Sequence, residues 1–126
     1  LGEDIDEKND PMALKYKVVP KNTLVYEIIG PMFFAAADKF LDISFEPGVK
    51  VLIIRMRGVP AMDVTALRSL KKIHATCKKR GITLLLSHVQ EQPYAMMAKA
   101  GFVYEIGEDN FCANIDAALE KAGEIR

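Results

Sequence analysis

The sequence predicts one small α/β domain with a largely parallel sheet. Strand-like and helix-like segments alternate from residue 23 to the C-terminal end, turn residues separate them, and 126 residues suit a single domain. This alternation is typical of right-handed crossovers between parallel strands. We therefore expect a small mixed, largely parallel sheet of about four or five strands, wrapped by about four helices.

The first residues differ in character from the rest. Residues 1–13 are polar, acidic and aperiodic, and we expect a linker there, with the folded domain over 14–126. The acidic start has neither the basic region nor the apolar core of a signal peptide. Position 1 is not Met, and we interpret the chain as a piece of a longer protein.

The N-terminal half of the domain predicts two strands and a helix. The segment 15–19 has the composition of a short first strand, and 23–29 (TLVYEII), β-branched and aromatic between turn residues, predicts a second. Pro31 then precedes an Ala-rich run, 32–41, whose Phe and Leu residues recur at helical spacing.

The middle of the chain contains the most apolar segments. Residues 49–56 (VKVLIIRM) form a nearly continuous apolar run, which predicts a central strand covered on both faces. A helix is expected to follow and to run to about Lys79, because Gly81 suits the position just after a helix. The run 82–87 (ITLLLS) predicts another buried strand.

The last third predicts helix, strand, helix. Pro93 opens a short helix over 93–100 that Gly101 ends, and 102–106 (FVYEI) has the composition of a short final strand. Residues 114–122 predict an amphipathic helix with one apolar stripe: Ile115, Ala118, Leu119 and Ala122.

The composition excludes several classes of function. Basic and acidic residues number 17 each, so the chain has no overall positive charge for nucleic acid. Its apolar runs are much shorter than the ~20 residues of a membrane span. Cys77 and Cys112 form neither a disulfide framework nor a metal-ligand spacing, which favours a reducing compartment.

The segment 58–70 (GVPAMDVTALRSL) reads as a turn that opens a helix. Asp63 is placed to be the N-cap, with its carboxylate accepting the backbone N–H of Thr65 or Ala66. We expect this structural role rather than catalysis, since no second acid, His or Cys lies nearby in sequence. Asp63 already supplies the negative charge that a helix start attracts, which weakens an anion-binding interpretation.

A helical wheel assigns the faces of this helix. The predicted core face comprises Ala66, Leu67, Leu70, Ile73, His74 and Cys77, and the predicted solvent face comprises Thr65, Ser69, Lys72 and Thr76. Met62, Val64 and Thr65 are then expected to project outward at the helix start.

Three other residues are weaker candidates for a functional site. His74 and Cys77 could share a metal, but both fall on the buried arc, so we predict packed side chains and no metal site. His88 follows a strand end, where α/β proteins often place functional groups, and is expected to be a loop residue. No Gly-rich phosphate-binding motif is present, and we expect no cofactor.

The helix also carries six cationic residues, of which three lie at its end: Arg68, Lys71, Lys72, Lys78, Lys79 and Arg80. Charges there complement the helix dipole. A docking face for an anionic partner or for lipid headgroups is the alternative.

Two stretches, in this order and separation, resemble the STAS domain family of sulfate transporters and anti-sigma factor antagonists. The first is 25–40 (VYEIIGPMFFAAADKF), similar to the start of STAS domains in SulP-type anion transporters. The second is 51–70, a buried strand followed by a loop, Asp, and Leu at helical spacing. Similarity extends over about residues 15 to 122.

The resemblance implies a cytoplasmic, non-enzymatic regulatory domain of a bacterial SulP transporter of sulfate or another anion, at the inner membrane. It implies contact with the transmembrane part of the same chain, and with a cytoplasmic protein partner or, weakly, a nucleotide. The predicted interaction loop comprises Pro60, Met62, Asp63, Val64, Thr65 and Arg68.

The alternative within the family is a freestanding anti-sigma factor antagonist, a partner switch in which a kinase phosphorylates a hydroxyl residue after the loop Asp. Thr65 is the candidate. The usual pattern is Asp, two hydroxyl residues and Gly, whereas here the run from Asp63 is Asp-Val-Thr-Ala. A small α/β enzyme is the third class, disfavoured because no nucleophile–base pair emerges.

Overall fold

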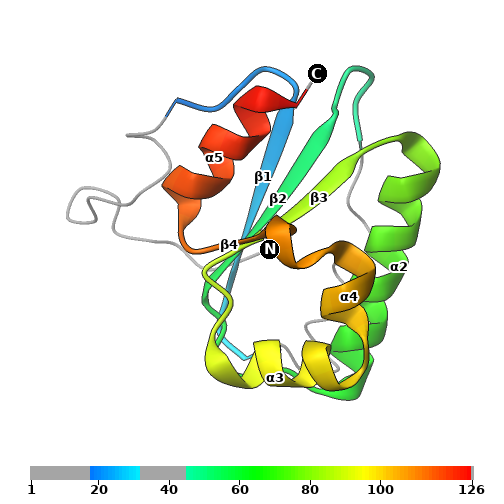
Figure 1. Ribbon diagram of the computed structural model, residues 1–126, viewed down its shortest axis with the longest axis vertical. Coiled ribbons are helices and arrows are strands. Elements are labelled where there is room, and N and C mark those ends of the chain that lie inside the picture. Colours follow the sequence, from blue (N-terminus) through cyan, green and yellow to red (C-terminus); the bar gives the residue numbers. More distant parts are fainter. Residues whose placement is uncertain (1–17, 32–44, 126) are drawn as a thin grey trace.

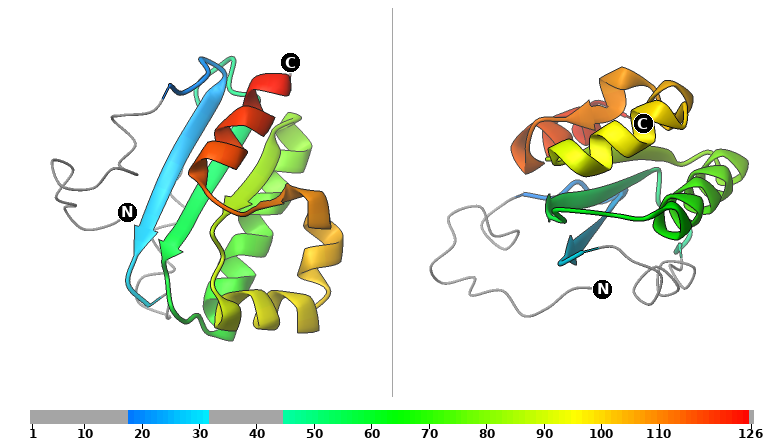
Figure 2. Two further views of the ribbon diagram at one scale, coloured as in Figure 1. Left: turned by 60° about the vertical axis from the view of Figure 1, so that its left-hand side comes forward. Right: turned by 90° about the horizontal axis from the view of Figure 1, so that it is seen from below.

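The computed structural model describes residues 18–31 and 45–125, which form a four-stranded parallel sheet with helices on both faces (Figures 1 and 2). The strands, in their order across the sheet, are β1 (Thr23–Ile29), β2 (Val51–Gly58), β3 (Thr83–Ser87) and β4 (Phe111–Cys112). The helices are α2 (Val64–Arg80), α3 (Glu91–Lys99), α4 (Phe102–Ile106) and α5 (Ile115–Glu124), with a 3-10 turn at Glu108–Asn110. All three strand pairings are parallel, so the predicted α/β class and largely parallel sheet are confirmed.

Strand β2 is central, as its apolar run predicted. It pairs with β1 on one side and β3 on the other, and its residues 51–56 are all buried. Because successive side chains of a strand point to opposite faces, Leu52 and Ile54 join one hydrophobic core, and Val51 and Ile53 join another.

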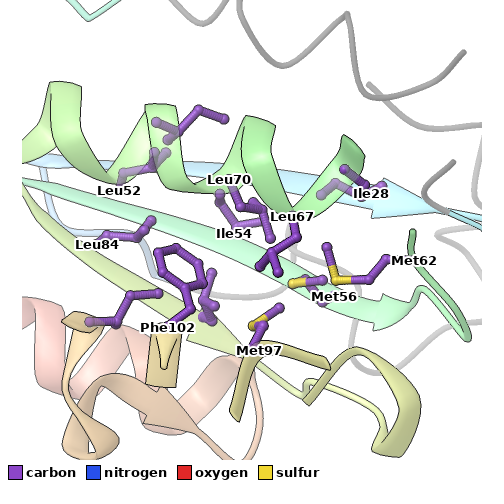
Figure 3. Close-up of a cluster of buried hydrophobic side chains, with 14 of the residues drawn as sticks. Ile28, Leu52, Ile54, Met56, Met62, Leu67, Leu70, Leu84, Met97 and Phe102 are labelled. Carbon is purple, nitrogen blue, oxygen red and sulfur yellow. The ribbon is translucent and has the colours of Figure 1, made fainter. Parts of the chain in front are cut away.

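The larger core lies between the sheet and helices α2, α3 and α4 (Figure 3). Leu70 of α2, Met97 of α3 and Phe102 of α4 are each fully buried in it. Complete burial of one such side chain stabilises the fold by about 1.5–3 kcal/mol. The smaller core lies under α5, whose predicted apolar stripe is buried as expected.

The predicted final strand at 102–106 is wrong, because this segment is helix α4. Phe102 and Ile106 face the larger core, whereas Tyr104, which a strand would place on the same face, is 92% exposed; this pattern is helical. Gly101, with φ of 78°, turns the chain from α3 directly into α4. The last strand instead consists of the two residues of β4, too short to give a periodic signal.

Several predicted segments fall outside the described residues: the linker 1–13, positions 15–17 of the first expected strand, and the helix 32–41. Val18 and Val19, the rest of that expected strand, belong to no strand. No helix in the described part of the chain has the length and apolarity that crossing a bilayer requires.

Candidate functional site

The predicted N-cap of α2 is present. The Asp63 carboxylate accepts the backbone N–H of Ala66 at 2.9 Å, and α2 begins at the next residue, Val64. At the other end Gly81, with φ of 71°, donates its backbone N–H to the Cys77 and Lys78 carbonyls. The helix is therefore fixed at both ends by the residues that the sequence indicated.

The outward projection predicted for Met62 is wrong. Its side chain is 2% exposed and belongs to the larger core (Figure 3). The side chain of Gln92 on α3 accepts the Met62 N–H at 2.9 Å and donates to the Met62 carbonyl at 3.2 Å. Met62 precedes the N-cap, so the helical wheel does not apply to it, and the loop turns its side chain inward.

The remaining residues of the predicted loop lie at or near the surface. Val64 is 55% exposed, Pro60 and Arg68 are exposed, and Asp63 and Thr65 are half-buried. Exposure at the start of α2 is thus confirmed for Val64 and is only partial for Thr65.

The solvent face of α2 also needs a correction. Lys72 and Thr76 are exposed as predicted, but Ser69 is buried and donates its hydroxyl to the Thr65 carbonyl at 3.3 Å. The buried arc is centred near Cys77 and Leu70, which brings Ser69 inside it. His74, predicted to be in the core, is half-buried.

A groove between α2 and α3, which we call the α2–α3 groove, adjoins Val64. It has a volume of about 490 Å³ and is lined by Val64, Leu67, Gln92, Ala95, Met96, Lys99 and Ala100. The sequence predicted exposure on the Val64 side of this groove but gave no indication of its α3 side. The signal available in the sequence was that α3 has more apolar residues than the core needs. Pro93 and Met97 are buried, and further Ala and Met residues of the helix are left over.

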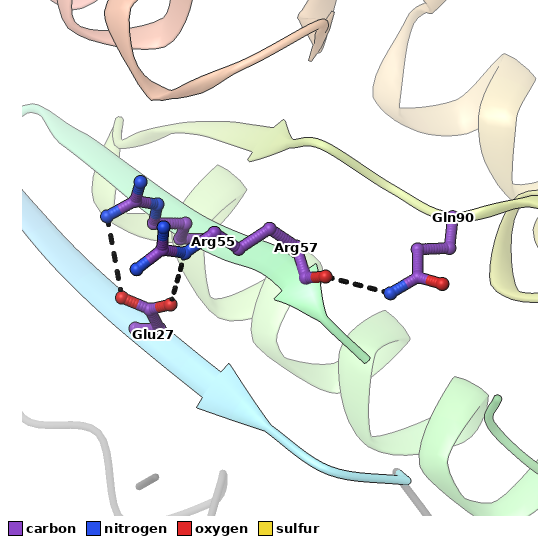
Figure 4. A network of polar contacts seen from close by, with 4 residues as sticks. All are labelled: Glu27, Arg55, Arg57 and Gln90. Carbon is purple, nitrogen blue, oxygen red and sulfur yellow. Dashed lines mark hydrogen bonds and ion pairs between the residues drawn. The ribbon is translucent and has the colours of Figure 1, made fainter. Parts of the chain in front are cut away.

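A second feature that sequence reasoning missed is a partly buried ionic cluster on the α5 face of the sheet (Figure 4). The Glu27 carboxylate of β1 accepts Nε of Arg57 at 2.9 Å and lies 3.5 Å from Nη1 of Arg55, both on β2. The side chain of Arg55 is 2% exposed. The signal was present as two arginines at alternate positions of an otherwise apolar strand.

Strand register extends this cluster into a row across the sheet. Glu27 pairs with Arg55, Arg55 with Ser87, and Ser87 with Cys112. In-register residues of parallel strands share a face. The Ser87 hydroxyl is buried and has no hydrogen-bond partner among the described residues, which is unusual for a buried polar group.

The groups that suggested metal or thiol chemistry are packed. His74 contacts Phe102 edge to face at 5.7 Å between ring centroids, and burial, with Lys78 nearby, lowers the pKa of its imidazole. Burial raises the pKa of the Cys77 thiol to about 11, so this thiol stays protonated and unreactive at neutral pH. Across 18–31 and 45–125, no three His, Cys, Asp or Glu residues gather as metal ligands.

Comparison with known proteins gives a consistent result. The profile of the STAS domain family matches residues 15–122. The structure superposes on a sulfate transporter family protein from Wolinella succinogenes with a TM-score of 0.86 and 41% identity, covering 92% of this chain and 97% of that one. The STAS domain of a SulP transporter from Vibrio cholerae gives a TM-score of 0.72 and 34% identity, covering 85% of each chain.

A longer relative is also similar. The Bacillus subtilis protein named "Putative sulfate transporter YvdB" is 33% identical over 91 residues. The matched region is 69% of this chain but only 17% of that protein's length.

Proposed function

This chain belongs to the STAS domain family, and we propose that it is the non-enzymatic cytoplasmic regulatory and interaction domain of a bacterial SulP-type transporter of sulfate or another anion. The supporting observation is similarity at 34% identity, over most of both chains, to the STAS domain of a SulP transporter. The raised pKa values of the Cys77 and Cys112 thiols add support, because they disfavour either thiol as a nucleophile.

We further propose that the domain acts by docking, and that its occupant is the cytoplasmic side of the transmembrane part of its own chain. The α2–α3 groove supports this assignment, because it is an apolar depression at the surface lined by residues that include Val64 and Met96. In the long relative, the matched region is a small fraction of the chain, so most of that protein lies outside it.

The charges beside the groove indicate which kind of segment would bind there. Lys99 lines the groove, and Arg68 is exposed one turn after Val64. A segment that inserts an apolar side chain and carries acidic residues beside it would complement this surface. Met62 has no contact role in this proposal, since its side chain instead supports the loop from below.

The experiment uses the full-length transporter in membrane vesicles. Val64→Asp places a charge on the exposed edge of the groove, and Thr76→Asp places the same charge on an exposed position farther along α2. Asp is compatible with the first helical turn at 64. We expect Val64→Asp to reduce anion uptake at unchanged protein amount, and Thr76→Asp to leave uptake unchanged.

Two outcomes would overturn the proposal. The first is equal uptake by both variants and the parent. The second is recovery of the native protein from its source cells as a short soluble chain phosphorylated at Thr65, which would indicate the anti-sigma factor antagonist. Mass spectrometry of the membrane and soluble fractions of the source cells shows whether the native protein is a transporter or the short phosphorylated chain.

A further inference from the structure

We propose that the exposed face of α2 binds the anionic headgroup surface of a lipid bilayer, with the exposed ring of Tyr104 on α4 at the edge of the contact. This inference rests on the proposed function, because a transporter domain lies beside a membrane. Five cationic side chains of one helix define what we call the basic face of α2: Arg68, Lys71, Lys72, Lys78 and Lys79.

Charge is unevenly divided between α2 and the rest of the chain. Helix α2 contains six of the 17 basic residues and none of the 17 acidic residues. The remaining segments carry 11 basic and 17 acidic residues, so a chain without net charge combines a helix of formal charge plus six with a remainder of minus six. A surface of negative potential would therefore orient the domain with α2 toward it.

The basic face lies on the side of α2 that points away from the core. Successive residues of a helix are about 100° apart, so the five cations fall within an arc of about 120°, opposite the buried Leu70 and Cys77. Four of the five side chains are exposed, and Lys71 is half-buried. Arg80 lies outside this arc, where its guanidinium carbon is 5.7 Å from the centroid of the Phe45 ring.

The positive charge of this face is not neutralised within the described residues. Neither an ion pair nor a side-chain hydrogen bond joins any of the five cations to another residue of 18–31 and 45–125. Glu105 is the one acidic residue that lines the hollow between α2 and α4, beside Lys71 and Lys78. Lys99 adds a further positive charge in the α2–α3 groove. The surface around α2 therefore remains cationic when its neighbouring acid is counted.

The type of cation favours lipid headgroups over a folded acidic protein. Four of the five are lysines, whose ammonium groups are point charges on flexible stems. Defined pairing with protein carboxylates more often uses the planar fork of arginine. A row of lysines can instead follow a fluid layer of phosphate groups, and each lysine adds to the attraction.

Tyr104 supplies an aromatic side chain beside the basic face. It is 92% exposed, and α4 and α2 cover the same face of the sheet (Figure 1). A tyrosine has an apolar ring and a polar hydroxyl, which suits the headgroup layer of a membrane. The hollow between α2 and α4 has a volume of about 400 Å³ and is lined by Lys71, His74, Ala75, Lys78, Tyr104 and Glu105.

The experiment measures binding of the 126-residue chain to lipid vesicles by co-sedimentation. Vesicles of phosphatidylcholine are compared with vesicles of phosphatidylcholine and phosphatidylglycerol in equal parts. We expect binding to the anionic vesicles alone, weakened by added salt. Lys72→Gln and Lys79→Gln should each weaken it about fivefold, the loss of one lysine contact with an anionic membrane. Lys21→Gln, the matched control, removes an exposed charge near the end of α5 and should leave binding unchanged.

A second measurement reports which side of the domain contacts the bilayer. The chain has no Trp, so Tyr104→Trp and Val18→Trp each introduce one fluorophore, at positions that are both largely exposed. With anionic vesicles, the emission of Tyr104→Trp should shift to shorter wavelength, and that of Val18→Trp should stay unchanged. Circular dichroism shows that each variant is folded.

Several results would overturn this proposal: no binding to anionic vesicles, equal losses in Lys21→Gln and Lys72→Gln, or equal emission shifts at the two probe positions. Binding to polyglutamate as tight as to the vesicles would also overturn it and would indicate an acidic protein partner. Vesicle binding together with unchanged uptake by Val64→Asp would refute the groove contact alone. Reduced uptake without vesicle binding would refute the lipid contact alone.

Discussion

The two faces of the sheet are built differently although they share the same strands. On the α2 face, β2 contributes Leu52, Ile54 and Met56, all fully buried among apolar neighbours. On the α5 face it contributes Val51 and Ile53 and then the two arginines. The first face is apolar along its whole length, and the second is apolar only under α5.

The two faces therefore contribute to the stability of the fold in different ways. A continuous apolar face needs no charge partner, whereas a buried guanidinium costs free energy unless its charge is matched. Glu27 supplies that match from the neighbouring strand. The α2 face therefore carries the larger hydrophobic core, and the α5 face combines a smaller core with a charged cluster toward the carboxyl ends of β1 and β2.

The largest expected change in the free energy of unfolding is for a residue at the edge of the core on the α2 face. Met62→Ala should lower the free energy of unfolding by about 3 kcal/mol, because it leaves a cavity in the larger core. Val64→Ala, two residues away but exposed, should change it by less than about 0.5 kcal/mol. Urea unfolding followed by circular dichroism measures both. Equal losses for the two variants would place Met62 at the surface.

The next effect tests the α5 face. Glu27→Gln should lower the free energy of unfolding by about 2 kcal/mol, because the guanidinium of Arg55 loses a charge partner in a buried site. In Arg55→Met that charge is absent, so adding Glu27→Gln there should cost clearly less. A double-mutant cycle by urea unfolding gives the coupling free energy. Additive effects would show that the ionic cluster is not a unit.

A smaller effect tests whether Asp63 acts only as a helix cap. Asp63→Ala should cost about 1 kcal/mol, and Asp63→Asn a few tenths, because the amide oxygen still accepts the Ala66 N–H. Thermal unfolding of both variants and the parent chain measures these losses. An equally large loss for both substitutions would point to a role for the charge.

The smallest effect is a pH dependence at the margin of the α2 face. Burial first, and Lys78 second, lower the pKa of His74 in the folded chain, while Glu105 opposes this. Below pH ~6.5 the unfolded chain takes up a proton more readily than the folded chain, so stability falls as the pH decreases. His74→Gln should flatten the urea midpoint across this window. An unchanged slope would assign the dependence to other groups.

The candidate site was predictable only in its local parts. Asp63 and Gly81 could be identified because capping depends on residues within one turn of each other. The contact between Gln92 and Met62, and that between Glu27 and the arginines, join residues 28 to 30 positions apart. No local pattern contains such pairs, because strand pairing and helix packing create them.

By itself, the sequence determined the parallel α/β class, the central position of β2, the limits of α2 and the apolar stripe of α5, since each depends on periodicity or on neighbouring residues. The tertiary structure alone decided that 102–106 is helical, that Met62 points inward, and that Arg55 lies beside Glu27 and Ser87. These outcomes depend on which elements become neighbours. Burial is a property of the packed assembly, so a side chain's exposure follows from what covers it as well as from its own hydrophobicity.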